Sequence, residues 1–180
     1  KHRGPDQSGV YISKKVGLGS VRLSIIDLSS GTMPLSNADD SLWIVFNGEI
    51  FNYIELREDL LAKGHSFRTH SDTEVIVHLY EEYGPDFVTQ LNGQFAIAIW
   101  DKNKEELFLA RDRVGIRPLY YTQAGESFVF ASEIKALMEF PGISPKLSAK
   151  GLSEYFTFWT SLSPNTVFED IYEVPPGTYM

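Results

Sequence analysis

Residues 46–53 read Phe-Asn-Gly-Glu-Ile-Phe-Asn-Tyr, and this stretch decides how the chain is expected to fold. The apolar run before it, residues 42–46, reads as a buried strand, and the polar pair Asn47-Gly48 predicts that the strand ends there. Asn52 stands where a helix cap belongs, with Glu55 three residues on as a capping box requires. A strand, a glycine turn and a helix start in close succession form a common setting for a small-molecule site. An ordinary strand-to-helix connection is the alternative, and spacing alone favours it.

The composition excludes several classes of protein. A chain of 180 residues with 43% hydrophobic and 13% aromatic residues can bury one substantial core. Its net charge is −8 and no Lys/Arg stripe occurs, which argues against a nucleic-acid partner. No apolar run approaches the ~18 residues of a membrane span, so we expect no membrane partner either.

The absence of cysteine is the second compositional signal. It excludes disulfides and thiolate metal sites within these residues and fits a reducing compartment weakly; we expect a cytoplasmic protein. The first residues, from Lys1 to Asp6, are neither a signal peptide nor a natural initiation site. The sequence therefore reads as a piece of a longer protein.

Hydrophobic periodicity predicts an α+β fold. Short strands are joined by hairpins and do not alternate strictly with helices, which favours antiparallel sheets with helices packed outside them over a doubly wound parallel sheet. Ser71 and Glu74 form a second capping box, and residues 27–40 read as a surface loop because they are rich in Ser, Gly, Asn and Asp. The predicted strands are 9–13, 21–25, 42–46 and the hairpins 95–110 and 119–130; the predicted helices are 53–63, 71–84, 85–92, 133–140 and 152–159, with a linker at 141–150.

Three charged residues suggest an amino-acid site. The guanidinium of Arg22 could hold an α-carboxylate with two hydrogen bonds, and Glu49 and Asp72 could hold an α-ammonium. Asn47 and the N–H of Gly48 could stabilise an oxyanion. The ordinary alternatives are a solvated strand face for Arg22 and a first-turn acid that stabilises its own helix for Asp72. No sequence argument brings the three segments together in space.

The other polar clusters point to structural roles. His2, His65, His70 and His78 show no metal-ligand spacing, so we expect surface or capping histidines and no metal site. The group Arg111 to Arg117 could hold an anion, but an ion-paired structural turn is the more common outcome. No phosphate-binding GxxxxGK[ST] loop occurs.

Seven motifs, in order along the chain, resemble the glutaminase domain of glutamine-dependent asparagine synthetases. These are class II glutamine amidotransferases, which carry an N-terminal nucleophile. A lone Asn-Gly-Glu would be weak, but the ordered set covers nearly the whole chain. The motifs are residues 2–6 (HRGPD), 21–27 (VRLSIID), 46–53 (FNGEIFNY), 71–74 (SDTE), 93–96 (GQFA), 107–121 and 130–134 (FASEI).

The resemblance implies a four-layer αββα sandwich of two antiparallel sheets, the N-terminal nucleophile hydrolase type. It implies that Arg22 binds the carboxylate of glutamine, that Asp72 with Glu49 binds its ammonium, and that Asn47 and Gly48 form the oxyanion hole. A Cys thiol, with its own α-amine as base, would attack the side-chain amide and release ammonia. This domain would need no cofactor, whereas a second domain would use ATP and Mg²⁺ to activate aspartate.

Two features of the sequence limit what the resemblance implies. The family's Cys precedes the HRGPD motif, which begins here at His2, so the first strand and the nucleophile are expected to be missing. The synthetase domain is expected to follow, with Pro175-Pro176-Gly177 as the boundary. Ser20 and Met33 stand where relatives often have His and Gln, and substrate handling could differ there.

Two other functions remain open at this point. One is a related amidotransferase that supplies ammonia to a sugar or antibiotic precursor, and the other is a non-catalytic glutamine-binding module. Glutamine and the synthetase domain of the parent chain are the expected partners. A homodimer is compatible with the sequence, which does not reveal the oligomeric state.

Overall fold

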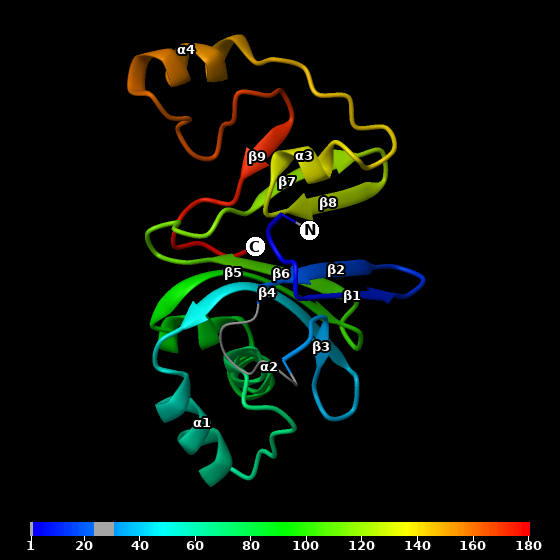
Figure 1. Ribbon diagram of the computed structural model, residues 1–180, viewed down its shortest axis with the longest axis vertical. Helices are drawn as coiled ribbons and strands as arrows, with labels where there is room; N and C mark the ends of the chain where they lie inside the picture. The colour runs from blue at the N-terminus through cyan, green and yellow to red at the C-terminus, as the bar shows by residue number, and fades with distance from the viewer. Residues whose placement is uncertain (1, 24–30) are drawn as a thin grey trace. The chain divides into compact units, whose positions relative to one another are not determined.

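The computed structural model describes residues 2–23 and 31–180 (Figure 1). The chain divides into two compact units, Lys1–Ala110 together with Met180, and Arg111–Tyr179. Each unit is built on its own antiparallel sheet, as the sequence predicts.

The first unit is organised around a four-stranded sheet in the order β3-β4-β5-β6. The central strands β4 (Leu42–Ile50) and β5 (Gly93–Asp101) pair antiparallel along their whole length, from Leu42 opposite Asp101 to Ile50 opposite Gly93. The strands outside them are β3 (Leu35–Ser36) and β6 (Glu106–Arg111). β4 carries the stretch that decides the fold, so the candidate site lies on a strand held by ladder hydrogen bonds.

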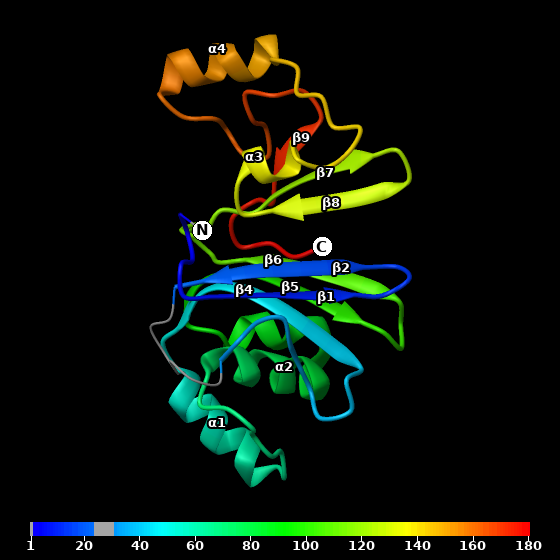
Figure 2. The same ribbon diagram turned by 45° about the vertical axis from the view of Figure 1, so that its right-hand side comes forward.

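Helices cover one face of this sheet and a hairpin covers the other (Figures 1 and 2). The helical face carries α1 (Tyr53–Ala62), α2 (Asp72–Tyr83) and the 3₁₀ segment η1 (Gly84–Gln90). The hairpin consists of β1 (Gln7–Ile12) and β2 (Gly17–Arg22), which pair antiparallel. Tyr11 of β1 stacks on Trp43 of β4 at 4.0 Å between ring centroids. Because side chains alternate along a strand, Trp43 faces the hairpin while Leu42 and Ile44 face the helices.

The hydrophobic core of the first unit lies between the sheet and α2. Ile44, Ile97 and Ile99 of the sheet are fully buried together with Ile76 and Leu79 of α2. α2 is buried at every position from Asp72 through Tyr80, polar residues included. Buried polar side chains need partners inside the protein. In α2 the carboxylates of Asp72 and Glu74 accept backbone N–H groups, whereas Nε2 of His78 has no hydrogen-bond partner among the described residues.

The second unit contains a three-stranded sheet in the order β8-β7-β9. Its strands are β7 (Tyr120–Ala124), β8 (Ser127–Ala131) and β9 (Ile171–Glu173), and its helices are α3 (Ile134–Leu137) and α4 (Ala149–Phe158). α4 lies close to residues 166–167, where a Cβ on Gly151 would come within 2.0 Å of the carbonyl oxygen of Thr166. Within the described ranges, 2–23 and 31–180, none of the helices has the length and apolar character needed to cross a bilayer.

Several boundaries differ from the sequence prediction. β4 does not end at Asn47-Gly48 but continues to Ile50, because both residues pair with β5. Residues 31, 33 and 35–37 are buried, so the predicted surface loop 27–40 is confirmed only at the exposed residues 32 and 38–40; residues 27–30 lie outside the described residues. The strand predicted over 21–25 ends at Arg22, and Ser24 and Ile25 also lie outside them. β9 is not predicted, and α3 is shorter than the predicted helix 133–140.

The two capping boxes are also only partly confirmed. Asn52 occupies the N-cap of α1, but its amide bridges Gln90 and Asn92 and does not cap the helix. Ser71 caps α2 by accepting from the N–H of Thr73. The partner acid, Glu74, bonds elsewhere, as described below.

Candidate functional site

Asp72 is a buried carboxylate at the first turn of α2, with an exposed fraction of 5%. Its Oδ2 accepts a hydrogen bond of 3.0 Å from the backbone N–H of Ile50, at the end of β4. Burial raises the pKa of Asp72 above its ordinary value; the N–H groups of Ile50 and Thr73 oppose this, and the charge of Glu49 adds to it. The carboxylate of Asp72 is therefore close enough to Glu49 of β4 for their charges to repel, and a bound cation would relieve that repulsion.

The edge of β4 that faces away from β5 presents backbone N–H groups to this region. Phe46 donates its N–H to the sulfur of Met33 at 3.3 Å, and Ile50 donates to Asp72. N–H groups two residues apart in a strand point to the same edge, so the N–H of Gly48, between them, is directed to this edge as well. Gly48 has the orientation that a donor to a developing oxyanion needs.

Glycine is required at position 48 because two backbones approach closely there. A Cβ at Gly48 would lie 2.0 Å from the carbonyl oxygen of Gln94 and 2.8 Å from Cα of Phe95. Any side chain would push β4 away from β5. The glycine therefore fixes the position of Asn47, which is half-buried on the same strand.

Met33 joins the segments that carry the candidate residues. Its sulfur lies between the N–H of Phe46, the residue before Asn47, and the hydroxyl of Thr73 at 4.0 Å, the residue after Asp72. Two residues earlier, Gly31 packs against Arg22, since a Cβ there would lie 2.6 Å from a guanidinium nitrogen. The segment from Gly31 to Met33 thus lies between β2, β4 and the start of α2.

Arg22 is half-buried at the end of β2, and its guanidinium donates to Oε1 of Gln7 at 3.0 Å. Gly4 supports it from the HRGPD motif, because a Cβ at Gly4 would meet the backbone N of Arg22 at 2.3 Å. In the structure, Asp72 lies near Glu49 and Asn47-Gly48 on β4. Arg22, at the end of β2, lies against the neighbouring segment from Gly31 to Met33. The positioning roles of Gln7 and Gly31 were not predicted, and Met33 was noted only as a departure from relatives, because these roles depend on contacts between distant segments.

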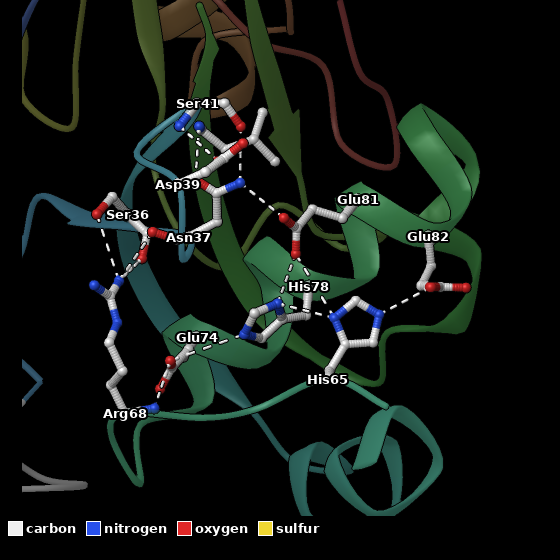
Figure 3. A network of polar contacts seen from close by, with 11 residues as sticks. Ser36, Asn37, Asp39, Ser41, His65, Arg68, Glu74, His78, Glu81 and Glu82 are labelled. Carbon is white, nitrogen blue, oxygen red and sulfur yellow. Dashed lines mark hydrogen bonds and ion pairs between the residues drawn. The ribbon is translucent and has the colours of Figure 1, made fainter. Parts of the chain in front are cut away.

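The prediction of a surface or capping role is wrong for His78, which is buried, and His65 is only partly exposed. His65, after α1, and His78, on α2, lie side by side with 3.2 Å between their Nδ1 atoms, and His78 is buried (Figure 3). His2 and His70 are exposed, as expected. The signal in the sequence was the spacing of Glu74, His78 and Glu81, which places them on one face of a helix.

Glu74 anchors the loop before α2. Its carboxylate accepts from the N–H of Arg68 at 2.8 Å and from the N–H and hydroxyl of Thr69 at 2.7 and 2.6 Å. Burial alone would raise its pKa, but the nearby imidazole of His78 and hydrogen bonds from Arg68 and Thr69 lower the pKa of Glu74 to about 2. Burial likewise opposes the charge on His78, whereas Glu74 and Glu81 raise the pKa of His78 to about 9.

The group Arg111 to Arg117 forms a structural turn, as the sequence favoured. The carboxylate of Asp112 accepts four backbone N–H groups, from residues 114, 115, 116 and 117, at 2.7–3.1 Å. Arg111 is buried, donates to the carbonyls of Gly115, Arg117 and Val174, and forms an ion pair with Glu173. These interactions occupy both side chains within the second unit.

Comparisons with known proteins show the family of the chain. The family model described as "Glutamine amidotransferase domain" matches residues 1–180. Asparagine synthetase [glutamine-hydrolyzing] 1 of Bacillus subtilis is 46% identical over 98% of this chain, and asparagine synthetase [glutamine-hydrolyzing] 2 of the same organism is 53% identical over 78%. The chain spans only 28% and 18% of the length of these two relatives.

A solved structure shows the same type of fold. It is the glutamine phosphoribosylpyrophosphate amidotransferase of B. subtilis, with a TM-score of 0.57 and 29% identity, covering 68% of this chain and 28% of that one. This likeness confirms the predicted αββα class with antiparallel sheets. The family match over every residue, together with these relatives, shows that the chain belongs to the glutamine amidotransferase domain family and confirms its resemblance to the domains of glutamine-hydrolysing asparagine synthetases.

Proposed function

We propose that this chain is the glutamine-binding and ammonia-releasing domain of an ATP-dependent asparagine synthase. Arg22 binds the α-carboxylate of glutamine, and Asp72 with Glu49 binds its α-ammonium. The observation that carries the proposal is the edge of β4, where Asp72 accepts from Ile50 and the N–H of Gly48 points the same way. Asp72 and the proposed oxyanion donor are thus associated with one edge, Glu49 is close enough to act on the charge of Asp72, and Gly31 packs against Arg22.

The geometry suggests how this edge acts on the amide. When a nucleophile attacks the side-chain carbonyl carbon of glutamine, negative charge develops on the amide oxygen. The side-chain amide of Asn47 and the N–H of Gly48 would donate hydrogen bonds to that oxygen, and ammonia would leave once the nitrogen is protonated. These donors are held in place by the β4–β5 ladder, so they need little reorganisation during the reaction.

The nucleophile has to come from outside these residues. The 180 residues contain no cysteine, so the proposal assigns the thiol to a Cys upstream of the HRGPD motif in the full protein. It assigns ATP, Mg²⁺ and aspartate to a second domain, consistent with relatives several times longer than this chain. We also propose a cytoplasmic location.

Glutamine binding can be tested on the 180-residue chain by calorimetry. Asp72→Asn keeps an acceptor for Ile50 but removes the charge, so affinity for glutamine should fall about 10- to 100-fold. Asp86→Asn is the matched control, because Asp86 is also a first-turn acid but is exposed on η1. Equal effects of the two variants, or no glutamine binding by the unmodified chain, would remove Asp72 from the site.

The reaction itself is tested in the full-length protein with either glutamine or ammonia as nitrogen source. Arg22→Ala should reduce the glutamine-dependent synthesis of asparagine strongly and leave the ammonia-dependent synthesis intact. Asn47→Ala should lower the glutaminase kcat about 10²- to 10³-fold. Equal loss of both activities in Arg22→Ala, or an unchanged kcat in Asn47→Ala, would contradict the assigned roles.

The acceptor distinguishes the two enzyme functions. A full-length protein that makes asparagine from aspartate, ATP and glutamine supports the proposal. A protein that hydrolyses glutamine but transfers ammonia to a sugar or antibiotic precursor supports the related amidotransferase. Glutamine binding without hydrolysis by the full-length protein would identify a non-catalytic glutamine-binding module.

A further inference from the structure

A compact cluster of metal-ligating atoms lies at the second half of α2, away from the glutamine site. It consists of Nδ1 of His65, Nδ1 of His78 and Oε2 of Glu81, which all lie within 4.8 Å of one another (Figure 3). The separations are 3.2 Å between the two nitrogens, 2.6 Å from His78 to Glu81 and 3.7 Å from His65 to Glu81. Two imidazole nitrogens this close need a shared proton or a common metal ion between them.

These separations match the dimensions of a tetrahedral metal site. Metal–nitrogen and metal–oxygen bonds of about 2.0–2.2 Å place neighbouring ligand atoms roughly 3.3 Å apart. The three measured separations lie around this value, so a shift of the Glu81 carboxylate, the most exposed of the three groups, would complete the geometry. The cluster therefore needs no backbone movement to bind an ion.

Two of the three groups, His65 and Glu81, are oriented from behind by a hydrogen-bond partner. Nε2 of His65 contacts Oε1 of Glu82 at 2.9 Å, whereas Nε2 of His78 lies 3.8 Å from Oε1 of Glu74, beyond hydrogen-bond distance. Asn37 donates to Oε1 of Glu81 at 2.7 Å, which leaves Oε2 turned to the histidines (Figure 3). A carboxylate behind each ligating imidazole is the usual outer shell of metal sites, because it fixes the ring and the tautomer.

The chemistry and exposure of the ligands indicate which ion would bind. Two imidazoles and one carboxylate suit Zn²⁺ and its neighbours in the first transition row, whereas Ca²⁺ and Mg²⁺ prefer oxygen ligands. His78 is buried, but the side chains of His65 and Glu81 are 15% and 29% exposed. One side is therefore open for entry of the ion and for a water as fourth ligand.

We propose that His65, His78 and Glu81 bind one divalent transition-metal ion, with Zn²⁺ the best match. The ion replaces the proton between the two imidazole nitrogens. It connects the segment after α1, which carries His65, to α2. Through Asn37 it also reaches the segment that continues from β3. Glu81 lies roughly 13 Å along the helix axis from Asp72, so the ion stabilises α2 and takes no part in the chemistry of glutamine.

The test uses the chain without an affinity tag, stripped of metal by a chelator and titrated with ZnCl₂ in a calorimeter. We expect one ion per chain with a Kd of about 10 µM or tighter and a higher Tm. Co²⁺ should replace Zn²⁺ and give visible absorption bands of a four-coordinate site. Absence of uptake by the folded chain would mean a hydrogen-bond network only and would overturn the proposal.

Variants separate this site from adventitious binding. Glu81→Gln keeps the shape and the contact with Asn37, and His65→Ala removes a ligand that lies outside the helices; each should weaken Zn²⁺ binding more than tenfold. Glu82→Gln changes the outer partner of His65, and the exposed ion pair of Glu82 with Lys63, and should weaken Zn²⁺ binding about tenfold. His70→Ala is the control, since His70 is an exposed histidine outside the cluster. Binding that His65→Ala leaves unchanged would overturn the assignment of the ligands.

Discussion

Single residues decide the geometry of the glutamine site, and Gly48 has the strongest steric requirement. Its Cα approaches the backbone of Gln94 so closely that a Cβ would lie 2.0 Å from the carbonyl oxygen. The sequence suggested a turn at this position, because glycine after asparagine is typical of turns. In the structure the glycine serves close packing of two paired strands, which only the register of β4 and β5 reveals.

Gly48→Ala should lower the free energy of unfolding by about 3 kcal/mol, because the clash is with backbone atoms that cannot rotate away. Urea denaturation measures the change. Gly17→Ala is the control: it lies in β2 with no atom within 4 Å of an added Cβ, and its effect should stay within about 0.5 kcal/mol. Equal stabilities of the two variants would show that β4 and β5 can separate without cost.

Asp72 lowers the stability of the fold although the proposed function requires it, because its buried charge opposes folding. Its raised pKa means that the folded protein binds a proton more tightly than the unfolded chain does. The protonated form thus contributes stability below the unfolded pKa near 3.8, and this is lost as the pH rises through the folded value.

Asp72→Asn removes the titration but keeps an oxygen for the N–H of Ile50. The variant should therefore unfold at higher urea concentration than the unmodified chain at pH 7, and the difference should shrink as the pH falls to 3. Its affinity for glutamine should fall at the same time, as proposed above. A variant that is less stable at pH 7, or a gain of equal size at both pH values, would contradict this explanation.

At the scale of elements, α2 connects the two candidate sites. Its first turn carries Asp72, and its second half carries His78 and Glu81. Hydrophobic periodicity and Ser71 predict the helix and its ends, and both are confirmed. Periodicity cannot show that the helix is buried on all sides, because burial of Glu74 and His78 depends on loops from elsewhere in the chain.

The sequence predicts elements that form through local interactions more accurately than elements that depend on segments far apart in the chain. The hairpins β5–β6 and β7–β8 are confirmed because a polar turn and alternating residues specify them locally. β3 has only two residues, and β9 is short and pairs with β7, which lies far back in the chain, so their local sequences carry little signal. The candidate site residues were predicted from sequence motifs. The contact of Met33 with β4 and α2 could be found only in the folded structure.

The turn after β6 gives a prediction at this scale. Asp112→Ala would remove the side-chain acceptor of four backbone N–H groups, of which only that of Gly115 keeps a bond to the carbonyl of residue 112, and this should lower the stability of the second unit by about 3 kcal/mol. Asp112→Asn keeps the oxygen that accepts three of them and should cost about 1 kcal/mol. Hydrogen exchange of peptides from residues 113–124 measures both, and equal exchange in the two variants would show that the turn does not depend on this carboxylate.

At the scale of the whole molecule, burial is unequal between the two units. The core cluster lies entirely within the first unit, where the sheet packs against α1, α2 and η1. The second unit buries few large apolar side chains, among them Leu119, Leu137, Ile171 and Val174. Its helix α4 buries only Gly151, while Phe156, Phe158 and Trp159 are exposed.

This inequality predicts that the units open with different free energies. Local stability follows the number of buried apolar contacts, so amides of β4, β5 and α2 should exchange with free energies close to that of global unfolding. Amides of β7, β8 and α4 should exchange with free energies lower by about 2 kcal/mol or more, because less apolar area protects them. Native-state hydrogen exchange at low denaturant measures both groups in one experiment.

The hairpin β1–β2 provides an internal control, since it belongs to the first unit but exposes Val10 and Ile12, and it should exchange early as well. A single exchange free energy for β4, β8 and the hairpin would mean that the chain unfolds as one cooperative body, and that the buried area of the first unit stabilises the second equally.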